Sequence, residues 1–233
     1  MQKPVNAVVH GGRCFISNYR GADFLLRPGG IGTLEISAKI AEHPELTSFI
    51  SRCADLRPNL FVDIGANIGL YSCILLRNRS VPRAILFEPD RLNLIQLKAN
   101  LLINHLLDLA EVHEVALGDV TGSSHLIPGL ADGGFSRVVD RASIGGLGYE
   151  VQIARLDDLL SLSGQRLAIK IDVEHYECRV LTGMARTLRQ NRCLVQVEAF
   201  ETRDQVIAMM ADAGYNLADS FSPNFVFASA GAL

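Results

Sequence analysis

The chain has 233 residues, 48% of them hydrophobic, and it carries a formal net charge of −3. A chain of this size and apolar content can bury a substantial core, so we expect one large domain with an attached cap. The slight acidic excess argues against a dedicated nucleic-acid-binding protein, because such proteins usually carry a basic surplus.

The cysteines and the lack of long apolar runs indicate the cellular compartment in which we expect the protein. The five cysteines include no Cys-x-x-Cys pair, which disfavours a zinc site or a disulfide framework and favours buried thiols. The N-terminus, Met1 to Asn6, lacks the apolar core of a signal peptide. No run of about 18 apolar residues predicts a membrane span. We therefore expect a cytoplasmic protein.

Residues 1–58 lie outside the regular pattern of the rest of the chain. We expect a strand pair at 13–17 and 24–27, followed by helices at 33–42 and 44–54. This segment is predicted to cap the sheet of a main domain that spans residues 59–233.

From residue 59 onward, strand-like and helix-like patterns alternate. The expected strands cover 60–64, 84–88, 111–117, 167–172 and 194–197, with final strands in 215–228. The expected helices cover 68–78, 90–105, 155–160, 178–190 and 202–213. This alternation predicts an α/β fold with a mostly parallel sheet and helices on both faces. The glycine-rich region 120–165 breaks the rhythm, and we interpret it as an insertion with a hairpin or loop.

The first expected strand runs into a glycine turn, Asp-Ile-Gly-Ala-Asn-Ile-Gly at 63–69. Such a turn lies at the sheet edge where open α/β folds bind nucleotides. Asn67 takes the place of the second glycine of a dinucleotide-binding turn, which disfavours NAD and FAD. The second expected strand ends at Glu88, close to the spacing of an acid that binds ribose. The pattern suits an adenosine ligand that has an amino-acid tail and no phosphate.

An acidic segment, Lys-Ile-Asp-Val-Glu-His-Tyr-Glu at 170–177, follows the fourth expected strand. Strand alternation places Lys170 and Asp172 on one face, and a buried Lys–Asp pair is costly unless it serves a site. Crowded carboxylates at Asp172, Glu174 and Glu177 suit a general base, and Asp172 and Glu174 are also candidate ligands of a divalent cation such as Mg²⁺. Histidine titrates near neutral pH, so His175 is a third candidate base beside Asp172 and Glu174.

Taken in order, these segments resemble the FkbM-type family of S-adenosylmethionine-dependent methyltransferases. The matching segments are Val62–Gly69, Phe87–Pro89, Asn100-x-x-x-Asn104, Ala116–Asp119, Leu156–Asp158, Ile169–Glu174 with Glu177, and Val197–Glu198. The resemblance implies a class I methyltransferase fold, a Rossmann-like sheet of seven strands whose last strand is antiparallel. It also implies S-adenosylmethionine as the cofactor.

The resemblance assigns residues to this cofactor by position. The methionine part would be surrounded by Asp63, Gly65, Ala66, Asn67 and Gly69, the ribose held by Glu88, and the adenine approached by Leu117, Gly118 and Asp119. Asp172 and Glu174 would border the transferring methyl group. The family commonly has glycine where this chain has His175, a departure that bears on the loop geometry and adds a candidate base.

Members of this family typically methylate hydroxyl oxygens on sugars or polyketide-type natural products. The resemblance therefore implies an O-methyltransferase acting on such a hydroxyl. Two alternatives stay open: a nucleic-acid methyltransferase on the same fold, which would want a basic groove, and a non-enzymatic binding module on a degenerate methyltransferase fold. A nicotinamide dehydrogenase is disfavoured by Asn67. Residues 1–58 and 120–150 match the family too poorly to define the acceptor.

Overall fold

The computed structural model describes residues 6–9, 12–27, 43–128, 136–139 and 148–232. The helix expected at 33–42 lies outside these residues, as does part of the glycine-rich region. The five cysteines lie within them and are free. Among the described residues, no helix is both long and apolar enough to cross a membrane.

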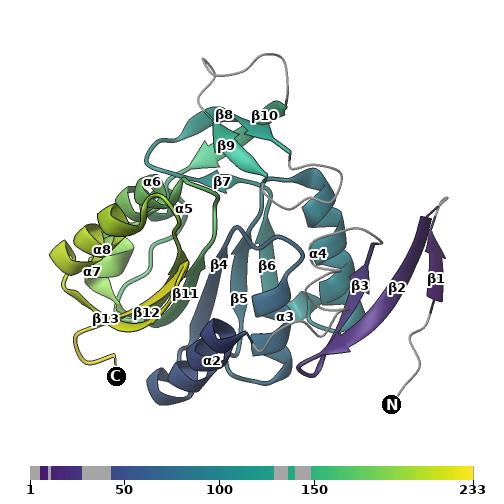
Figure 1. The fold of residues 1–233 in the computed structure, drawn as a ribbon, viewed down its shortest axis with the longest axis horizontal. Coiled ribbons are helices and arrows are strands. Elements are labelled where there is room, and N and C mark those ends of the chain that lie inside the picture. Colours follow the sequence, from purple (N-terminus) through teal and green to yellow (C-terminus); the bar gives the residue numbers. More distant parts are fainter. Residues whose placement is uncertain (1–5, 10–11, 28–42, 129–135, 140–147, 233) are drawn as a thin grey trace.

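A seven-stranded sheet forms the centre of the molecule (Figure 1). Its strands, in spatial order, are β13 (Tyr215–Phe221), β14 (Asn224–Ser229), β12 (Arg192–Glu198), β11 (Arg166–Ile171), β4 (Leu60–Ile64), β5 (Ala84–Phe87) and β6 (Ala110–His113). The last strand, β14, is antiparallel to both neighbours, and the other pairs are parallel. This order confirms the predicted seven-stranded, mostly parallel sheet.

Successive strand residues enter two separate cores, one on each face of the sheet. Leu60 and Val62 of β4 pack with the helices α5 (Leu156–Leu159), α6 (Glu177–Gly183), α7 (Ala185–Gln190) and α8 (Arg203–Asp212). Phe61 packs on the opposite face with α2 (Pro44–Leu56), α3 (Leu70–Arg77) and α4 (Arg91–Ile103). A strand buried on both faces must be apolar at nearly every position, which explains the uninterrupted apolar runs in the sequence.

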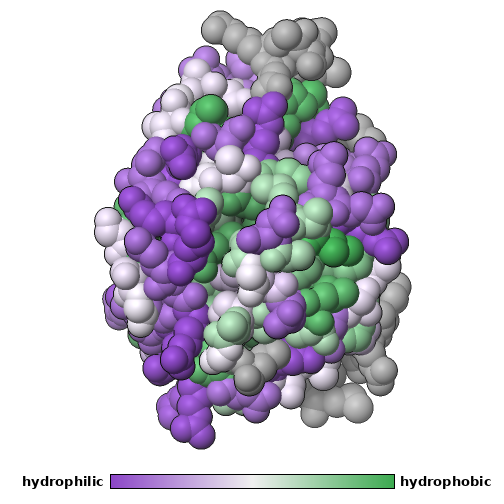
Figure 2. Space-filling model, turned by 90° about the vertical axis from the view of Figure 1, so that its left-hand side faces the viewer, coloured by the Kyte–Doolittle hydropathy of each residue, from purple (hydrophilic) through white to green (hydrophobic). Residues whose placement is uncertain are grey.

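The helix α8 buries only its sheet-facing side. Val206 and Met210 are fully buried, whereas Ala208 and Ala211 are exposed. Figure 2 shows the side of the molecule that carries α8 and β13, where apolar residues gather near the centre and hydrophilic residues surround them. Leu217 on the edge strand β13 is exposed as well. The layer therefore has the one-sided burial expected of a helix packed on a sheet.

The N-terminal segment forms a separate antiparallel sheet of three strands, one more than predicted: β1 (Asn6–Val9), β2 (Gly12–Tyr19) and β3 (Ala22–Leu26). Two asparagines hold β3 in place, one within α4 and one directly after its last residue. Asn100 Oδ1 accepts from Leu25 N at 2.8 Å, and Asn104 Oδ1 accepts from Asp23 N at 2.9 Å. The Asn-x-x-x-Asn pair therefore joins the N-terminal segment to the main domain. A domain boundary at residue 58 stays a prediction.

The single strand expected at 111–117 is wrong. The strand β6 ends at His113, whose carbonyl oxygen accepts from Glu88 N at 3.1 Å. The next strand, β7 (Ala116–Leu117), belongs to a second sheet with β10 (Tyr149–Ala154), β8 (Gly122–Ile127) and β9 (Arg137–Val139). Pairing with β10 draws the chain away from the main sheet after His113. This small sheet, which holds the described part of the insertion, lies over the end of the main sheet (Figure 1).

The single helix expected at 178–190 is also wrong, because it breaks at Met184 into α6 and α7. A Cβ atom at Gly183 would overlap the Gly118 carbonyl oxygen, so the end of α6 lies directly against the backbone that follows β7. At the start of α7, the buried Asp157 carboxylate accepts from Arg186 N at 2.7 Å and Thr187 N at 2.9 Å. Asp157, which lies in α5, therefore caps the N-terminus of α7.

We expect Asp157→Ala to lower the free energy of unfolding by about 1–3 kcal/mol, because it leaves buried N–H donors without partners. Urea unfolding followed by circular dichroism would measure this. The neighbouring Asp158→Ala removes an exposed carboxylate and is the matched control, with a change within about 0.5 kcal/mol. Equal stability of the two variants would contradict a capping role for Asp157.

Candidate active site

A cavity of about 620 Å³, including its open mouth, lies between the main sheet and the small sheet. It is found where β4, β5 and β11 end, and β4 has β5 on one side and β11 on the other. Open α/β sheets bind their ligands at such a switch in strand order. The size is in the usual range for a pocket that holds a small-molecule cofactor, roughly 300–1,000 Å³.

The glycine turn after β4 forms one wall of the cavity through Gly65 and Asn67. Gly65 has a φ of 76°, and a Cβ atom there would overlap the Asp172 carbonyl oxygen. The glycine is therefore needed for close packing of two strand ends, in addition to its place in the wall. Asn67 has a φ of 50°, in the left-handed region that asparagine tolerates better than most residues.

Glu88 joins this turn to the end of β5. Its side chain is buried, with Oε2 accepting from Asn67 N at 2.7 Å and Oε1 from Asp90 N at 2.8 Å. Burial raises the pKa of the Glu88 carboxyl to about 7, although hydrogen bonds from Asp90 and Asn67 oppose the rise. The carboxyl lies in the cavity wall, at the position expected for a group that binds ribose hydroxyls.

Part of the cavity wall is apolar. Leu126 and Val138 enter from the small sheet, while Phe87, Val115 and Leu117 line the side formed by the ends of β5 and β6 and by β7. Such a lining suits a flat, weakly polar ring. The region 120–165 therefore contributes directly to the same cavity as the glycine turn.

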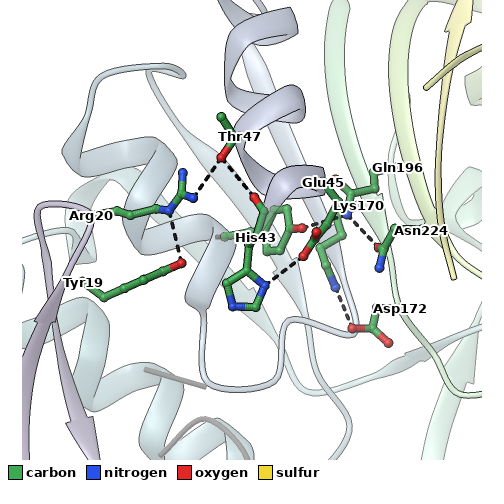
Figure 3. Close-up of polar contacts among 10 residues, drawn as sticks. Tyr19, Arg20, His43, Glu45, Thr47, Lys170, Asp172, Gln196 and Asn224 are labelled. Atoms are coloured by element: carbon green, nitrogen blue, oxygen red, sulfur yellow. Dashed lines mark hydrogen bonds and ion pairs between the residues drawn. The ribbon is translucent and has the colours of Figure 1, made fainter. Parts of the chain in front are cut away.

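Two carboxylates close the opposite end of the cavity, Asp172 and Glu174. Lys170 Nζ donates to Asp172 Oδ2 at 2.7 Å, as the predicted shared face requires (Figure 3). Glu174 is half-buried, and burial followed by the nearby Asp172 charge raises the pKa of its carboxyl. The end of β11 thus presents one carboxylate held by a cation and a second that accepts protons more readily than usual.

His175 and Glu177 lie outside the cavity wall. The His175 side chain is 43% exposed, with Nδ1 at 3.9 Å from Glu201 Oε2. Glu177 is buried and braces the loop, because its carboxylate accepts from His175 N at 2.8 Å and Thr202 Oγ1 at 2.6 Å. The structure therefore places Asp172 and Glu174 in the cavity wall, and His175 and Glu177 outside it.

Comparison with protein families identifies the domain. The family described as the methyltransferase FkbM domain matches residues 63–217. The chain belongs to the FkbM methyltransferase family. Among characterised sequences, methyltransferase sdnD from Sordaria araneosa is 27% identical over 198 residues, which covers 70% of this chain and 76% of that protein.

Solved structures show the same fold. The methyltransferase FkbM from Methylobacillus flagellatus KT has a TM-score of 0.55 and 19% identity; the match covers 73% of this chain but only 43% of that one. The tRNA (uracil-54, C5)-methyltransferase of Pyrococcus abyssi, in complex with S-adenosyl-L-homocysteine, has a TM-score of 0.51 and 12% identity, covering 92% of this chain and 42% of that one. At these identities the likeness shows the fold alone, and that fold is the class I methyltransferase fold.

Several residues expected to touch the cofactor of this FkbM methyltransferase are not part of the wall of the described cavity. Asp63 is 1% exposed and accepts from Ser72 Oγ at 2.6 Å, while burial raises the pKa of its carboxyl. Ala66, Gly69, Gly118 and Asp119 are likewise not among the wall residues of the described cavity. A Cβ atom at Gly69 would overlap the Leu97 side chain, and Asp119 lies 3.5 Å from Arg179 Nη1. Direct contact of these residues with the cofactor stays a prediction.

The suggestion of a divalent cation finds no supporting cluster among the described residues. No group of three or more His, Cys, Asp or Glu side chains in that part of the chain could hold a metal ion. The Asp172 carboxylate instead has the Lys170 ammonium beside it.

Sequence reasoning missed the parts of the FkbM site that come from the small sheet, together with Tyr176. Tyr176 lines the cavity, is 8% exposed, and lies beneath Gly118, where a Cβ atom would come within 2.9 Å of its ring. Its position within the acidic segment was visible in the sequence. Leu126 and Val138 gave no such signal, because only the fold of the insertion brings them over the sheet.

Glu88 leads to a prediction about pH. An acid whose pKa rises on folding makes the folded chain bind more protons between the two pKa values, here 4.5 and about 7, so stability falls as pH rises through that window. Glu88→Gln removes this titration. Between pH 5 and pH 8 the wild-type free energy of unfolding should fall by about 1–3 kcal/mol more than that of the variant. Urea unfolding at both pH values measures the difference.

Glu150→Gln removes an exposed carboxyl from the small sheet and serves as the control. It should keep the wild-type difference between pH 5 and pH 8. If Glu88→Gln also keeps that difference, the Glu88 carboxyl is already ionised at pH 5 and its pKa is not raised.

Proposed function

We propose that this FkbM methyltransferase uses S-adenosylmethionine to methylate a hydroxyl oxygen, with Glu174 as the general base. The observation that carries the proposal is the charge of the cavity wall. The described wall contains three carboxylates, those of Glu88, Asp172 and Glu174, and no lysine, arginine or histidine. An acidic wall favours a cationic ligand and disfavours one that carries phosphates.

The residues present fit S-adenosylmethionine. The apolar side near Phe87 and Leu117 suits an adenine ring, and the Glu88 carboxyl can accept from ribose hydroxyls while it holds the glycine turn. The Asp172 end of the wall suits a positively charged sulfonium and ammonium. A dinucleotide fits less well, because the Asn67 N–H that could face a phosphate is already donated to Glu88.

S-adenosylmethionine supplies an electrophilic methyl group when bound. An alcohol is a weak nucleophile, so its proton must leave as the new C–O bond forms. The half-buried Glu174 carboxylate is placed to take that proton, because it lines the cavity and its pKa is raised by burial and by Asp172. His175 is disfavoured as the base because it lies outside the wall and near Glu201.

The acceptor hydroxyl belongs to a sugar, a glycan or a polyketide-type natural product in this proposal, as the resemblance to the family implies. Figure 3 shows Glu45, at the start of α2, on the same side of the sheet as Lys170 and Asp172. This carboxylate is paired with His43 at 2.8 Å. A nucleic acid is a poor fit to this surface, and a cytoplasmic location stays a prediction.

The function is tested first by cofactor binding and then by transfer. Isothermal titration calorimetry should show binding of S-adenosylmethionine to the wild-type chain. Mass spectrometry with isotope-labelled S-adenosylmethionine should then detect label on a member of a panel of glycosides and hydroxylated polyketides. Binding without transfer to any member would favour the binding-module alternative, and no binding would contradict the cofactor.

With the labelled acceptor in hand, Glu174→Gln should lower kcat by about 10²–10⁴-fold, because the proton has no acceptor. Its Kd for S-adenosylmethionine should rise by much less than kcat falls, because Glu88 and Asp172 still give the wall negative charge. His175→Ala should retain most of the wild-type kcat. Wild-type turnover in Glu174→Gln, or a loss confined to His175→Ala, would show that Glu174 is not the base.

A further inference from the structure

Lys170 is a buried cation in the middle of the main sheet. It lies on β11, between β4 and β12, and is 7% exposed. A lysine is almost never buried to this extent without partners, because removing its ammonium from water costs several kcal/mol. The sheet therefore needs a local reason to keep a charge here.

Three groups surround the Lys170 ammonium. Its Nζ lies 2.7 Å from Asp172 Oδ2 (Figure 3). The same nitrogen lies 4.9 Å from the centre of the Tyr71 ring. Asp63, which is 1% exposed, occupies the paired position on β4. Burial alone would lower the pKa of Lys170, but the Asp172 charge, with Tyr71 and Asp63, outweighs burial and raises it. The ammonium thus pairs directly with one carboxylate in the cavity wall, Asp172, and also feels the charge of Asp63 behind it.

The Tyr71 ring is itself held in place. Its hydroxyl oxygen accepts from Gln196 Nε2 at 2.7 Å, and the same amide nitrogen donates to Asn224 Oδ1 at 2.8 Å. Gln196 is fully buried. The ammonium therefore rests on a ring that is fixed from β12 and β14, so Lys170 is a rigid donor.

The backbone of Asp172 is fixed without any help from Lys170. Its N–H donates to the Ile64 carbonyl oxygen at 3.0 Å, and its own carbonyl packs against Gly65. The side chain, 29% exposed, is the part left to orient. Among the described residues, the hydrogen bond that orients this carboxylate comes from Lys170.

We propose that Lys170 is a positioning residue that holds the Asp172 carboxylate toward the cofactor cavity. The proposal rests on the function proposed above, because the orientation of Asp172 matters when a cationic methyl donor occupies the cavity. Lys170 is not among the wall residues, so it acts through Asp172. Fixing the carboxylate before binding avoids the entropy cost of ordering it when the ligand arrives.

A comparison of two ligands reports on this role. S-adenosylmethionine carries a positive sulfonium, whereas S-adenosylhomocysteine has a neutral thioether in its place. A fixed carboxylate favours the first over the second. Removing the positive charge of Lys170 would by itself strengthen the preference for the cationic S-adenosylmethionine. Loss of the Asp172 orientation would weaken that preference, so the two effects can be told apart by their direction.

The experiment is a double-mutant cycle on the full chain, with both Kd values measured by calorimetry. Asp172→Asn and Lys170→Met should each reduce the preference for S-adenosylmethionine, by about three- to tenfold, and the double variant should lose no more than Asp172→Asn alone. Lys170→Arg should retain most of the preference, because it keeps a donor to Asp172. A purely structural role would lower stability and leave the ratio of Kd values unchanged.

Lys170→Met leaves two carboxylates without their cation, so a second variant guards against misfolding. Asp63→Asn with Lys170→Met removes one charge of each sign and keeps the net charge of the cluster. It should fold and show the same reduced preference. Lys98→Met, at an exposed lysine on α4, is the matched control and should keep the wild-type ratio.

An unchanged or increased preference in the Lys170 variants, with a reduced preference in Asp172→Asn, would overturn the positioning role alone. Failure of the wild-type chain to bind either ligand would overturn the proposed function and this inference with it. The two failures are distinguished by the wild-type titration.

Discussion

The close approach of two strand ends, those of β4 and β11, is the constraint on which the site depends. Gly65 has a φ of 76°, and any side chain there would overlap the Asp172 carbonyl oxygen. A hydrogen bond of 3.0 Å from Asp172 N to the Ile64 carbonyl oxygen spans the same junction. This contact places the glycine turn and the acidic segment in one cavity wall. With a bulkier residue at Gly65 the two strand ends would separate, and the carboxylates would no longer share a surface with the turn.

The distribution of charge around this junction accounts for the kind of ligand that the cavity favours. The wall presents carboxylates, and the buried cation Lys170 lies behind one of them. Burial raises the pKa values of Glu88 and Glu174, so each gains from a positive ligand beside it. The Asn67 N–H, which a phosphate-binding turn would leave for its ligand, is donated to Glu88. In this chain the Asn67 N–H of the turn therefore binds the Glu88 carboxyl group and is not available to a dinucleotide phosphate.

The sequence predicted those strands and helices that have a clear apolar pattern of their own. It did not predict where an element ends when that end depends on contacts with residues far along the chain. The runs 60–64 and 167–172 were recognisable because strands buried on both faces are apolar throughout. The break after His113 depends on β10, some forty residues later along the chain, and the break at Met184 depends on Gly118 and Asp157. The local pattern placed Asp63 beside the glycines, but its burial and its hydrogen bond from Ser72 of α3 depend on the packing of that helix. Its register opposite Lys170 could not be read from the local pattern.

In the acidic segment, the backbone of His175 and its side chain have different surroundings. Its φ of 74° lies in the left-handed region that favours glycine. Histidine enters this region more readily than most residues, so His175 adopts this loop geometry at a modest cost in strain. Glu177 fixes the same backbone by accepting from His175 N. The imidazole lies 3.9 Å from Glu201 Oε2 and outside the cavity wall, whereas Asp172 and Glu174 of the same segment line the cavity.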